Sequence, residues 1–196
     1  MKTNNFYINK ELPKNIKLIG ISGLAHTGKD TLANFFKEEK NDMILDSFAT
    51  PIKDMMINYF GFSREQVYNQ ELKELKDEFW DITPRKLMQL IGTEMFRKIF
   101  RYDVWVKVFE KKVLNNPNDF FIVSDIRFNN EAEMVSRNNG IVIKILRNSD
   151  NIVDISHESE KGIDDNLVHI FLDNNGNLND LKKNAIEILN IIKSRN

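Results

Sequence analysis

The chain has 196 residues, of which 41% are hydrophobic and 29% are charged, as in an ordinary folded domain rather than a disordered or membrane-embedded chain. Its 28 Lys and Arg are balanced by 29 Asp and Glu, so no overall positive field favours a nucleic-acid polymer, and an anionic ligand requires a local cluster of cations. The absence of cysteine excludes disulfides, thiol nucleophiles and cysteine-ligated metals.

Short apolar runs alternate with helical patterns along the chain. Residues 1–17 have no long apolar run, so we expect a loose arm there and neither a leader nor a membrane anchor. We expect buried strands at 17–22, 43–48, 120–124, 141–146 and 168–172. We expect helices from about 31, at 52–59, 71–79, 85–100, 104–114, 130–138 and 178–193. This alternation predicts an α/β fold with a parallel sheet of about five strands covered by helices on both faces.

The long helical stretch exceeds what one crossover between strands needs. We therefore expect a single domain over 1–196, with a core at about 17–50 and 118–194 and a helical insertion at about 51–116 that covers a substrate. The sequence contains no internal repeat and no Pro/Gly-rich linker that would suggest a second domain.

The segment after the first expected strand has the spacing of a phosphate-binding loop. Gly23 and Gly28 frame a match to G-x-x-x-x-G-K between a strand and a helix. Glycines permit the tight backbone whose N–H groups, with the Lys29 ammonium, surround the triphosphate of ATP. The alternative is an ordinary glycine turn with a solvated lysine. The residues predicted to bind ATP are Gly23, Ala25, His26, Thr27, Gly28, Lys29, Asp30 and Thr31.

The position after Lys29 departs from the usual loop, where Ser or Thr binds Mg²⁺. Asp30 stands there, and the hydroxyl is displaced to Thr31. A carboxylate can hold Mg²⁺ directly or through water, and Thr31 can donate to a phosphate oxygen. We therefore predict that Asp30 belongs to a Mg²⁺ site, the alternative being an acidic residue that only stabilises the first helical turn.

Four segments resemble the deoxynucleoside monophosphate kinase family found in bacteriophages. They are Gly28-Lys29-Asp30-Thr31, the Phe-Ala-x-Pro-Ile-Lys run at 48–53, the Arg-x-Leu-x-Gln-x-x-Gly-Thr-Glu run at 85–94 and the Asp-x-Arg-Phe-x-Asn-Glu run at 125–131. The resemblance spans about 18–175 and implies a three-layer P-loop kinase fold. It also implies a nucleotide kinase that moves the γ-phosphate of ATP to a nucleoside monophosphate.

The resemblance places the acceptor nucleotide beside the helical insertion. It implies that Arg85 and Gln89 face the acceptor and that Trp105 stacks on or packs near its base, with core packing as the alternative. Lys53 is a candidate for the acceptor phosphate or a solvated lysine. On the expected helix at 85–100, the spacing predicts an inward apolar side and an opposite polar stripe, formed respectively by Leu87, Leu90, Ile91 and by Arg85, Gln89, Thr93, Arg97.

A second carboxylate follows the strand expected at 120–124. Asp125 ends that strand, where a carboxylate lies beside Mg²⁺ opposite the phosphate loop. The resemblance implies that Arg127 binds a phosphate and that Glu131 orients an arginine or the acceptor; the alternative is a surface salt-bridging turn. It also implies a lid-like segment at about 147–165, in which Arg147 neutralises charge during transfer, while His157 is more simply a solvated residue.

The acceptor of a monophosphate kinase is already an anion, so no general base is needed. If the acceptor were an alcohol, as in the related dephospho-coenzyme A kinases, Asp125 would have to accept a proton. A regulatory ATPase that binds a nucleotide without transferring phosphate is the other alternative. We expect ATP and Mg²⁺ as cofactors, a small nucleotide as partner, no membrane or nucleic-acid partner and a cytoplasmic location, that of the host if the protein is viral. The accepted base and the formation of a homodimer are left open.

Overall fold

The computed structural model describes residues 5–148 and 161–195. It divides into two compact units, unit 1 comprising Met1–Ser47 and Phe109–Asn196, and unit 2 comprising Phe48–Val108. Helix α5, Val104–Asn115, runs from the end of unit 2 into unit 1. Unit 2 covers most of the stretch in which the sequence predicts a helical insertion.

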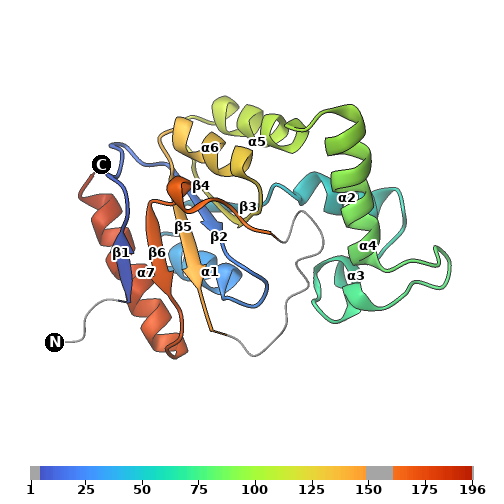
Figure 1. Cartoon of the computed structure of the whole chain (residues 1–196), viewed down its shortest axis with the longest axis horizontal. Coiled ribbons are helices and arrows are strands. Elements are labelled where there is room, and N and C mark those ends of the chain that lie inside the picture. Colours follow the sequence, from blue (N-terminus) through green and yellow to red (C-terminus); the bar gives the residue numbers. More distant parts are fainter. Residues whose placement is uncertain (1–4, 149–160, 196) are drawn as a thin grey trace. The chain divides into compact units, whose positions relative to one another are not determined.

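A six-stranded sheet forms the centre of unit 1, in the order β1-β6-β5-β2-β4-β3 (Figure 1). Its strands are β1 Phe6–Ile8, β2 Leu18–Ser22, β3 Met43–Asp46, β4 Phe120–Ile126, β5 Ile141–Leu146 and β6 Ile170–Asp173. The five strands from β2 to β6 are parallel to one another, as the sequence predicts. Their carboxyl ends therefore meet at one edge of the sheet, where open α/β sheets bind ligands.

Helices cover both faces of this sheet, which gives three layers (Figure 1). On one face, α1 Lys29–Glu39 and α7 Leu178–Lys193 pack their apolar sides against alternate strand residues, for example Ile19 and Ile21 of the central strand. On the other face lies α6 Asn129–Arg137, and a Cβ on Gly20 of β2 would come within 3.1 Å of the Val135 side chain. Strands buried on both faces explain why their sequences are continuous apolar runs.

The amino-terminal arm is more ordered than the sequence indicates. We expected a loose arm over residues 1–17, whereas Phe6–Ile8 forms β1 and pairs antiparallel with β6. Tyr7 stacks on Phe171 with ring centroids 5.1 Å apart, and Leu12 further along the arm is buried in the core. A run of only three apolar residues among Asn and Lys gives too weak a pattern to predict a strand, and its pairing partner lies more than 160 residues away.

Unit 2 is built from short helices around its own apolar cluster. They are α2 Thr50–Asn58, α3 Arg64–Tyr68, η1 Leu72–Glu74, α4 Pro84–Gln89 and η2 Leu90–Phe100, followed by the first residues of α5. Ile52, Met56, Val67, Ile91 and Trp105 are among the buried residues that hold these helices together.

The helix predicted at 71–79 is wrong. Side chains in this stretch compete with a helical backbone, because the Asn69 amide oxygen accepts from the N–H groups of Glu71 and Leu72, and Asp77 Oδ1 accepts from those of Phe79 and Trp80. A helix that we did not predict, α3, lies just before it. A capping box in which Ser63 and Gln66 exchange side-chain to backbone hydrogen bonds starts this helix.

The polar stripe expected along the 85–100 helix does not extend past Gln89. Residues 90–100 form a π-helix, in which each turn takes more residues than in an α-helix, so the faces predicted from α-helical spacing no longer hold. Leu90, predicted to face inward, is 40% exposed, whereas Thr93 and Arg97, predicted to be solvated, are buried. The Arg97 guanidinium donates to the carbonyl of Tyr102 at 3.0 Å.

Candidate active site

The loop between β2 and α1 has the backbone conformation that its glycines permit. Gly28 caps the start of α1 with φ +99°, and Gly23 has φ +153°. A Cβ on Gly28 would lie 2.6 Å from the Asn174 amide nitrogen, and one on Gly23 would lie 2.7 Å from the carbonyl oxygen of Ile145. Both positions therefore exclude larger residues on conformational and steric grounds.

Lys29 is the first residue of α1, at the end of the helix whose dipole and free amides favour an anion. Its ammonium donates to the Leu24 carbonyl at 2.6 Å, so it folds back across the loop. The buried Thr27 hydroxyl donates to the same carbonyl at 2.9 Å. In the middle of the loop, Ala25 is half-buried and His26 is exposed. The loop, its lysine and the helix start thus form a compact site for an anion with several oxygens.

Asn174 stabilises the phosphate loop, and we did not predict this role from the sequence. It follows β6, its backbone N–H donates to Leu146 at the end of β5, and its buried side-chain amide donates to the carbonyl of Thr27 at 2.8 Å. The only signal in the sequence is that Asn174 lies two residues after the strand predicted at 168–172, among other turn-forming residues. Because its amide lies under Gly28, Asn174 links the phosphate loop to two strands of the sheet.

The two carboxylates predicted to bind metal are each held by a serine hydroxyl. Ser124 donates to Asp30 Oδ1, and Ser47 donates to Asp125 Oδ2, both at 2.6 Å. Asp30 and Asp125 are thereby connected through adjacent residues of β4, which lies next to β2. The atoms that Asp30 and Asp125 offer to a metal ion are carboxylate oxygens, the type of ligand that Mg²⁺ prefers. Within 5–148 and 161–195, no group of three or more acidic or histidine residues is placed to hold a metal ion.

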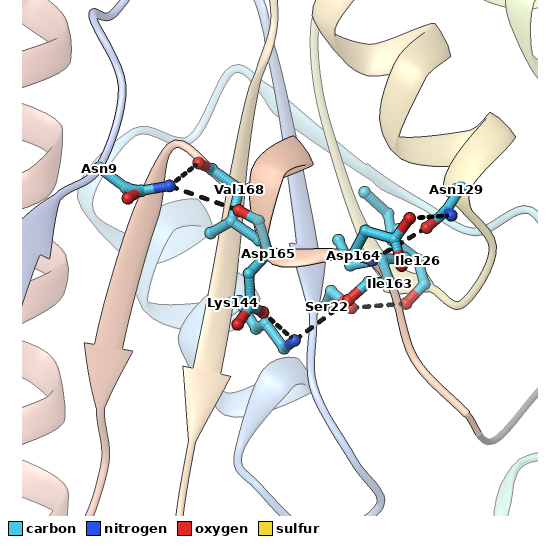
Figure 2. A network of polar contacts seen from close by, with 9 residues as sticks. All are labelled: Asn9, Ser22, Ile126, Asn129, Lys144, Ile163, Asp164, Asp165 and Val168. Atoms are coloured by element: carbon cyan, nitrogen blue, oxygen red, sulfur yellow. Dashed lines mark hydrogen bonds and ion pairs between the residues drawn. The ribbon is translucent and has the colours of Figure 1, made fainter.

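The turn after β4 carries Arg127 and is fixed by Glu131. The buried Glu131 carboxylate accepts from the backbone N–H groups of Arg127 at 2.8 Å and Phe128 at 3.1 Å, closing the start of α6. The Ser22 hydroxyl at the end of β2 donates to the Ile126 carbonyl at 3.0 Å, which joins this turn to the phosphate loop's strand (Figure 2). Glu131 therefore fixes the backbone that presents Arg127 at the same sheet edge as Lys29.

Polar contacts also anchor the chain where it returns to the sheet after residue 160. Asn129 exchanges two hydrogen bonds with Asp164, and the Lys144 ammonium contacts the Ile163 carbonyl and the Asp165 carboxylate (Figure 2). These contacts connect the start of α6 and strand β5 to the segment that leads into β6. Of the predicted lid-like segment, residues 149–160, with His157 among them, lie outside the described residues.

Arg147 lies at the same end of the sheet as the phosphate loop. It comes directly after β5, the strand beside β2, and its side chain is exposed. The structure thus brings to one sheet edge the predicted residues of unit 1 that carry charge: Lys29, Asp30, Asp125, Arg127 and Arg147.

Unit 2 holds the residues predicted to bind an acceptor. The Lys53 ammonium lies 4.6 Å from the ring centre of Tyr68, the Arg85 guanidinium pairs with the Glu74 carboxylate, and Gln89 is half-buried at the end of α4. Trp105 is 5% exposed, and its indole N–H donates to the Gly92 carbonyl at 2.8 Å. The structure therefore places Trp105 in the apolar core of unit 2, in line with the packing alternative that the sequence left open.

Comparison with known proteins identifies the family. The sequence profile of the family described as deoxynucleotide monophosphate kinase matches residues 57–185, which is more than half of the chain. The chain belongs to the deoxynucleotide monophosphate kinase family. It is accordingly a nucleotide kinase, a phosphotransferase whose acceptor is a nucleoside monophosphate.

Viral proteins are similar to this deoxynucleotide monophosphate kinase family member over most of its length. A protein of Acanthamoeba polyphaga mimivirus that carries the family's name is 34% identical over 146 residues, covering 66% of this chain and 74% of the relative. The deoxynucleoside-5'-monophosphate kinase of Escherichia phage T5 is 27% identical over 211 residues, covering 74% and 84%. The deoxynucleotide monophosphate kinase of Enterobacteria phage T4 is 27% identical over 139 residues, covering 68% and 55%.

The P-loop kinase fold expected from the sequence agrees with this family and with the sheet of unit 1. Among the described residues of this family member, none of the helices combines the length and apolar character needed to span a bilayer.

Proposed function

We propose that this nucleotide kinase transfers the γ-phosphate of ATP to a deoxynucleoside monophosphate, with Mg²⁺ as the metal. The observation that supports this most directly is the loop from Gly23 to Thr31, in which glycines with positive φ bring backbone amides and Lys29 to the start of α1. When ATP binds, the Lys29 ammonium exchanges the Leu24 carbonyl for oxygens of the β- and γ-phosphates.

Asp30 and Asp125 are the residues that would hold Mg²⁺, directly or through water. The serine hydroxyls bonded to each carboxylate fix their orientation, which favours a preformed site. When bound, Mg²⁺ neutralises charge on the phosphate oxygens during transfer. Without a cation, Asp30 would repel the phosphates that Lys29 attracts, so we expect nucleotide binding in this loop to depend on the metal.

The reaction needs positioning and charge neutralisation more than proton transfer. An oxygen of the acceptor phosphate attacks the γ-phosphorus as the bond to the bridging oxygen of ADP breaks, and no proton has to move. Arg127, held by Glu131 at the end of β4, and Arg147, after β5, supply positive charge for the transferred group. We further propose that Lys53, Arg85 and Gln89 of unit 2 bind the acceptor.

The test is ADP formation with ATP, Mg²⁺ and each deoxynucleoside monophosphate in turn. We expect rapid ADP formation only when an accepted monophosphate is present, whereas equal ADP formation without it would indicate hydrolysis and contradict the proposal. In Lys29→Ala we expect turnover to fall about a hundredfold or more, since a charge that stabilises the transition state is lost. Lys183→Ala removes an exposed lysine of α7 and is the matched control, with expected turnover near that of the wild type.

A further inference from the structure

Two cations of unit 2 lie against one aromatic ring. The Lys53 ammonium of α2 is 4.6 Å from the centre of the Tyr68 ring, and the Arg64 guanidinium carbon of α3 is 5.1 Å from it. Tyr68 is 45% exposed, so the ring and both charges lie at the surface of this unit. Sequence reasoning singled out Lys53 alone, because α3 was not predicted and the i, i+4 relation between Arg64 and Tyr68 was therefore not seen.

The two positive charges are close enough to repel each other. Since both lie within reach of one ring centre, they are at most about 10 Å apart, a distance that salt at physiological concentration does not fully screen. The carboxylates of unit 2 that form ion pairs serve other cations, namely Lys76, Arg85, Lys98, Arg101 and Lys107. In the part of the chain that the structure describes, neither Lys53 nor Arg64 has a carboxylate within ion-pair distance.

The acidic residues next to Lys53 and Arg64 in the sequence do not neutralise the two positive charges at the Tyr68 ring. Asp54 and Glu65 directly follow the two cations in sequence, so each is rotated by about 100° around its helix from the side that meets Tyr68. A pair of like charges held together without a counter-charge is a site that an anion would stabilise.

The arrangement of the two cations is built into the core of the unit. Val67 of α3 is 1% exposed and belongs to the same apolar cluster as Ile52 and Met56 of α2, so the two helices that carry the cations are packed together. The Ser63 and Gln66 capping box fixes the start of α3 immediately beside Arg64. The face of Tyr68 then attracts both cations, which offsets part of their repulsion when no anion is bound.

We propose that Lys53 and Arg64 together bind the dianionic phosphate group of the acceptor nucleotide, and that Tyr68 is the residue that positions them. This inference rests on the proposed function, which it deepens by naming a second cation and a positioning ring. Two cations at one phosphate favour a dianionic monoester over an uncharged nucleoside. These two cations therefore recognise the charge of the acceptor's phosphate group.

The first experiment measures steady-state kinetics with the accepted deoxynucleoside monophosphate. In Arg64→Gln and Lys53→Gln we expect KM for the acceptor to rise tenfold or more, with KM for ATP unchanged and kcat within about threefold of wild type, because a charge-assisted contact to a non-reacting phosphate oxygen is lost. Lys86→Gln, which removes an exposed lysine of α4, is the control and should leave all three constants unchanged. An unchanged acceptor KM in both cation variants would overturn the proposal.

The positioning role of Tyr68 has its own readout. Tyr68→Phe keeps the ring and should behave like the wild type, whereas Tyr68→Leu should raise the acceptor KM several-fold, since both cations lose their common contact. Tyr59→Leu removes an exposed tyrosine at the end of α2 that has no cation over it, and should have no effect. Equal KM values for the Phe and Leu variants of Tyr68 would show that the ring does not position the cations.

A binding measurement separates this inference from the proposed function. Inorganic phosphate is titrated into the full chain while amide NMR signals of Arg64 and Tyr68 in unit 2 and of Gly28 in the phosphate loop are followed. We expect saturable shifts at Arg64 and Tyr68 in the wild type that disappear in Arg64→Gln, while shifts at Gly28 persist. If turnover with every monophosphate is absent but these shifts occur, the proposed function fails and the anion site stands. If turnover is normal but Arg64 and Tyr68 do not shift, the inference fails alone.

Discussion

His169 offers a test of the fold through the pH dependence of stability. It lies between the short 3₁₀-helix η4, Asp165–Leu167, and β6 and is 7% exposed, and its Nδ1 accepts a hydrogen bond from the backbone N–H of Val142 at 3.1 Å. Burial, with a smaller contribution from the positive charge of Lys10, lowers the pKa of His169 from 6.5 to about 4. The protein therefore folds with this imidazole neutral, and protonation of His169 favours the unfolded chain.

The size of the effect follows from the difference in pKa. One pKa unit corresponds to about 1.4 kcal/mol, so the shift of His169 amounts to about 3 kcal/mol. Its sign is set by a folded-state pKa that lies below the unfolded value. The stability that the neutral imidazole contributes is fully present above pH 6.5, decreases as the pH falls towards 4 and is then lost. About 3 kcal/mol is a large part of the stability of a typical domain.

The assay compares urea unfolding of the wild type and His169→Asn between pH 7.5 and 4.5. The asparagine oxygen can still accept the hydrogen bond from Val142 but does not titrate. Other titrating groups contribute to both proteins, so they cancel in the difference between the two free energies of unfolding. We expect the free energy of unfolding of the wild type, relative to that of His169→Asn, to decrease by about 1.4 kcal/mol per pH unit below pH 6. A difference that does not depend on pH would refute the reasoning.

Three further predictions concern the site. Asn174→Ala removes the buried hydrogen bond to the carbonyl of Thr27; we expect a loss of about 1–3 kcal/mol in urea unfolding and a higher KM for ATP, and unchanged ATP affinity would contradict a supporting role for Asn174. Trp105→Phe leaves the Gly92 carbonyl without its donor and should lower stability by about 1–3 kcal/mol with the acceptor KM unchanged; a raised acceptor KM at full stability would instead indicate base stacking. Glu131→Gln replaces the carboxylate that accepts from two backbone N–H groups by a weaker amide acceptor. We expect kcat to fall and KM for ATP to stay unchanged. An unchanged kcat would show that Glu131 does not position Arg127 for catalysis.

The sheet and the phosphate loop could be predicted from the sequence because their signals are local. A strand buried on both faces is a continuous apolar run, and β5 and α7 begin and end at the residues that the sequence predicts. The loop from Gly23 to Lys29 is recognisable because its glycines and lysine have a fixed spacing that the backbone geometry requires.

The elements that could not be predicted depend on distant or competing contacts. Strand β1 exists because it pairs with β6 at the other end of the chain, and the 71–79 region avoids a helix because Asn69 and Asp77 bind the backbone. The π-helix at 90–100 changes the faces that we derived from α-helical spacing beyond Gln89, so Leu90 is exposed and Thr93 and Arg97 are buried, although Ile91 is buried as predicted.

For the site, sequence patterns identified charged residues but not the groups that hold them. Asp30, Asp125, Arg127 and Glu131 are charged residues in recognisable motifs, whereas the serines at 47 and 124 that donate to the two aspartates were not predicted. Ser, Asn and Tyr occur at many surface positions, so only the structure reveals that Asn174 lies under the loop and that Tyr68 lies beside two cations.

Transfer of the γ-phosphate of ATP to a nucleoside monophosphate is the proposed reaction. It is tested most directly with ATP labelled at the γ-phosphate, by following where the label goes in the presence of Mg²⁺ and the four deoxynucleoside monophosphates. We expect labelled deoxynucleoside diphosphate from the wild type and almost none from Lys29→Ala. Label that appears only as inorganic phosphate, whichever monophosphate is present, would contradict it.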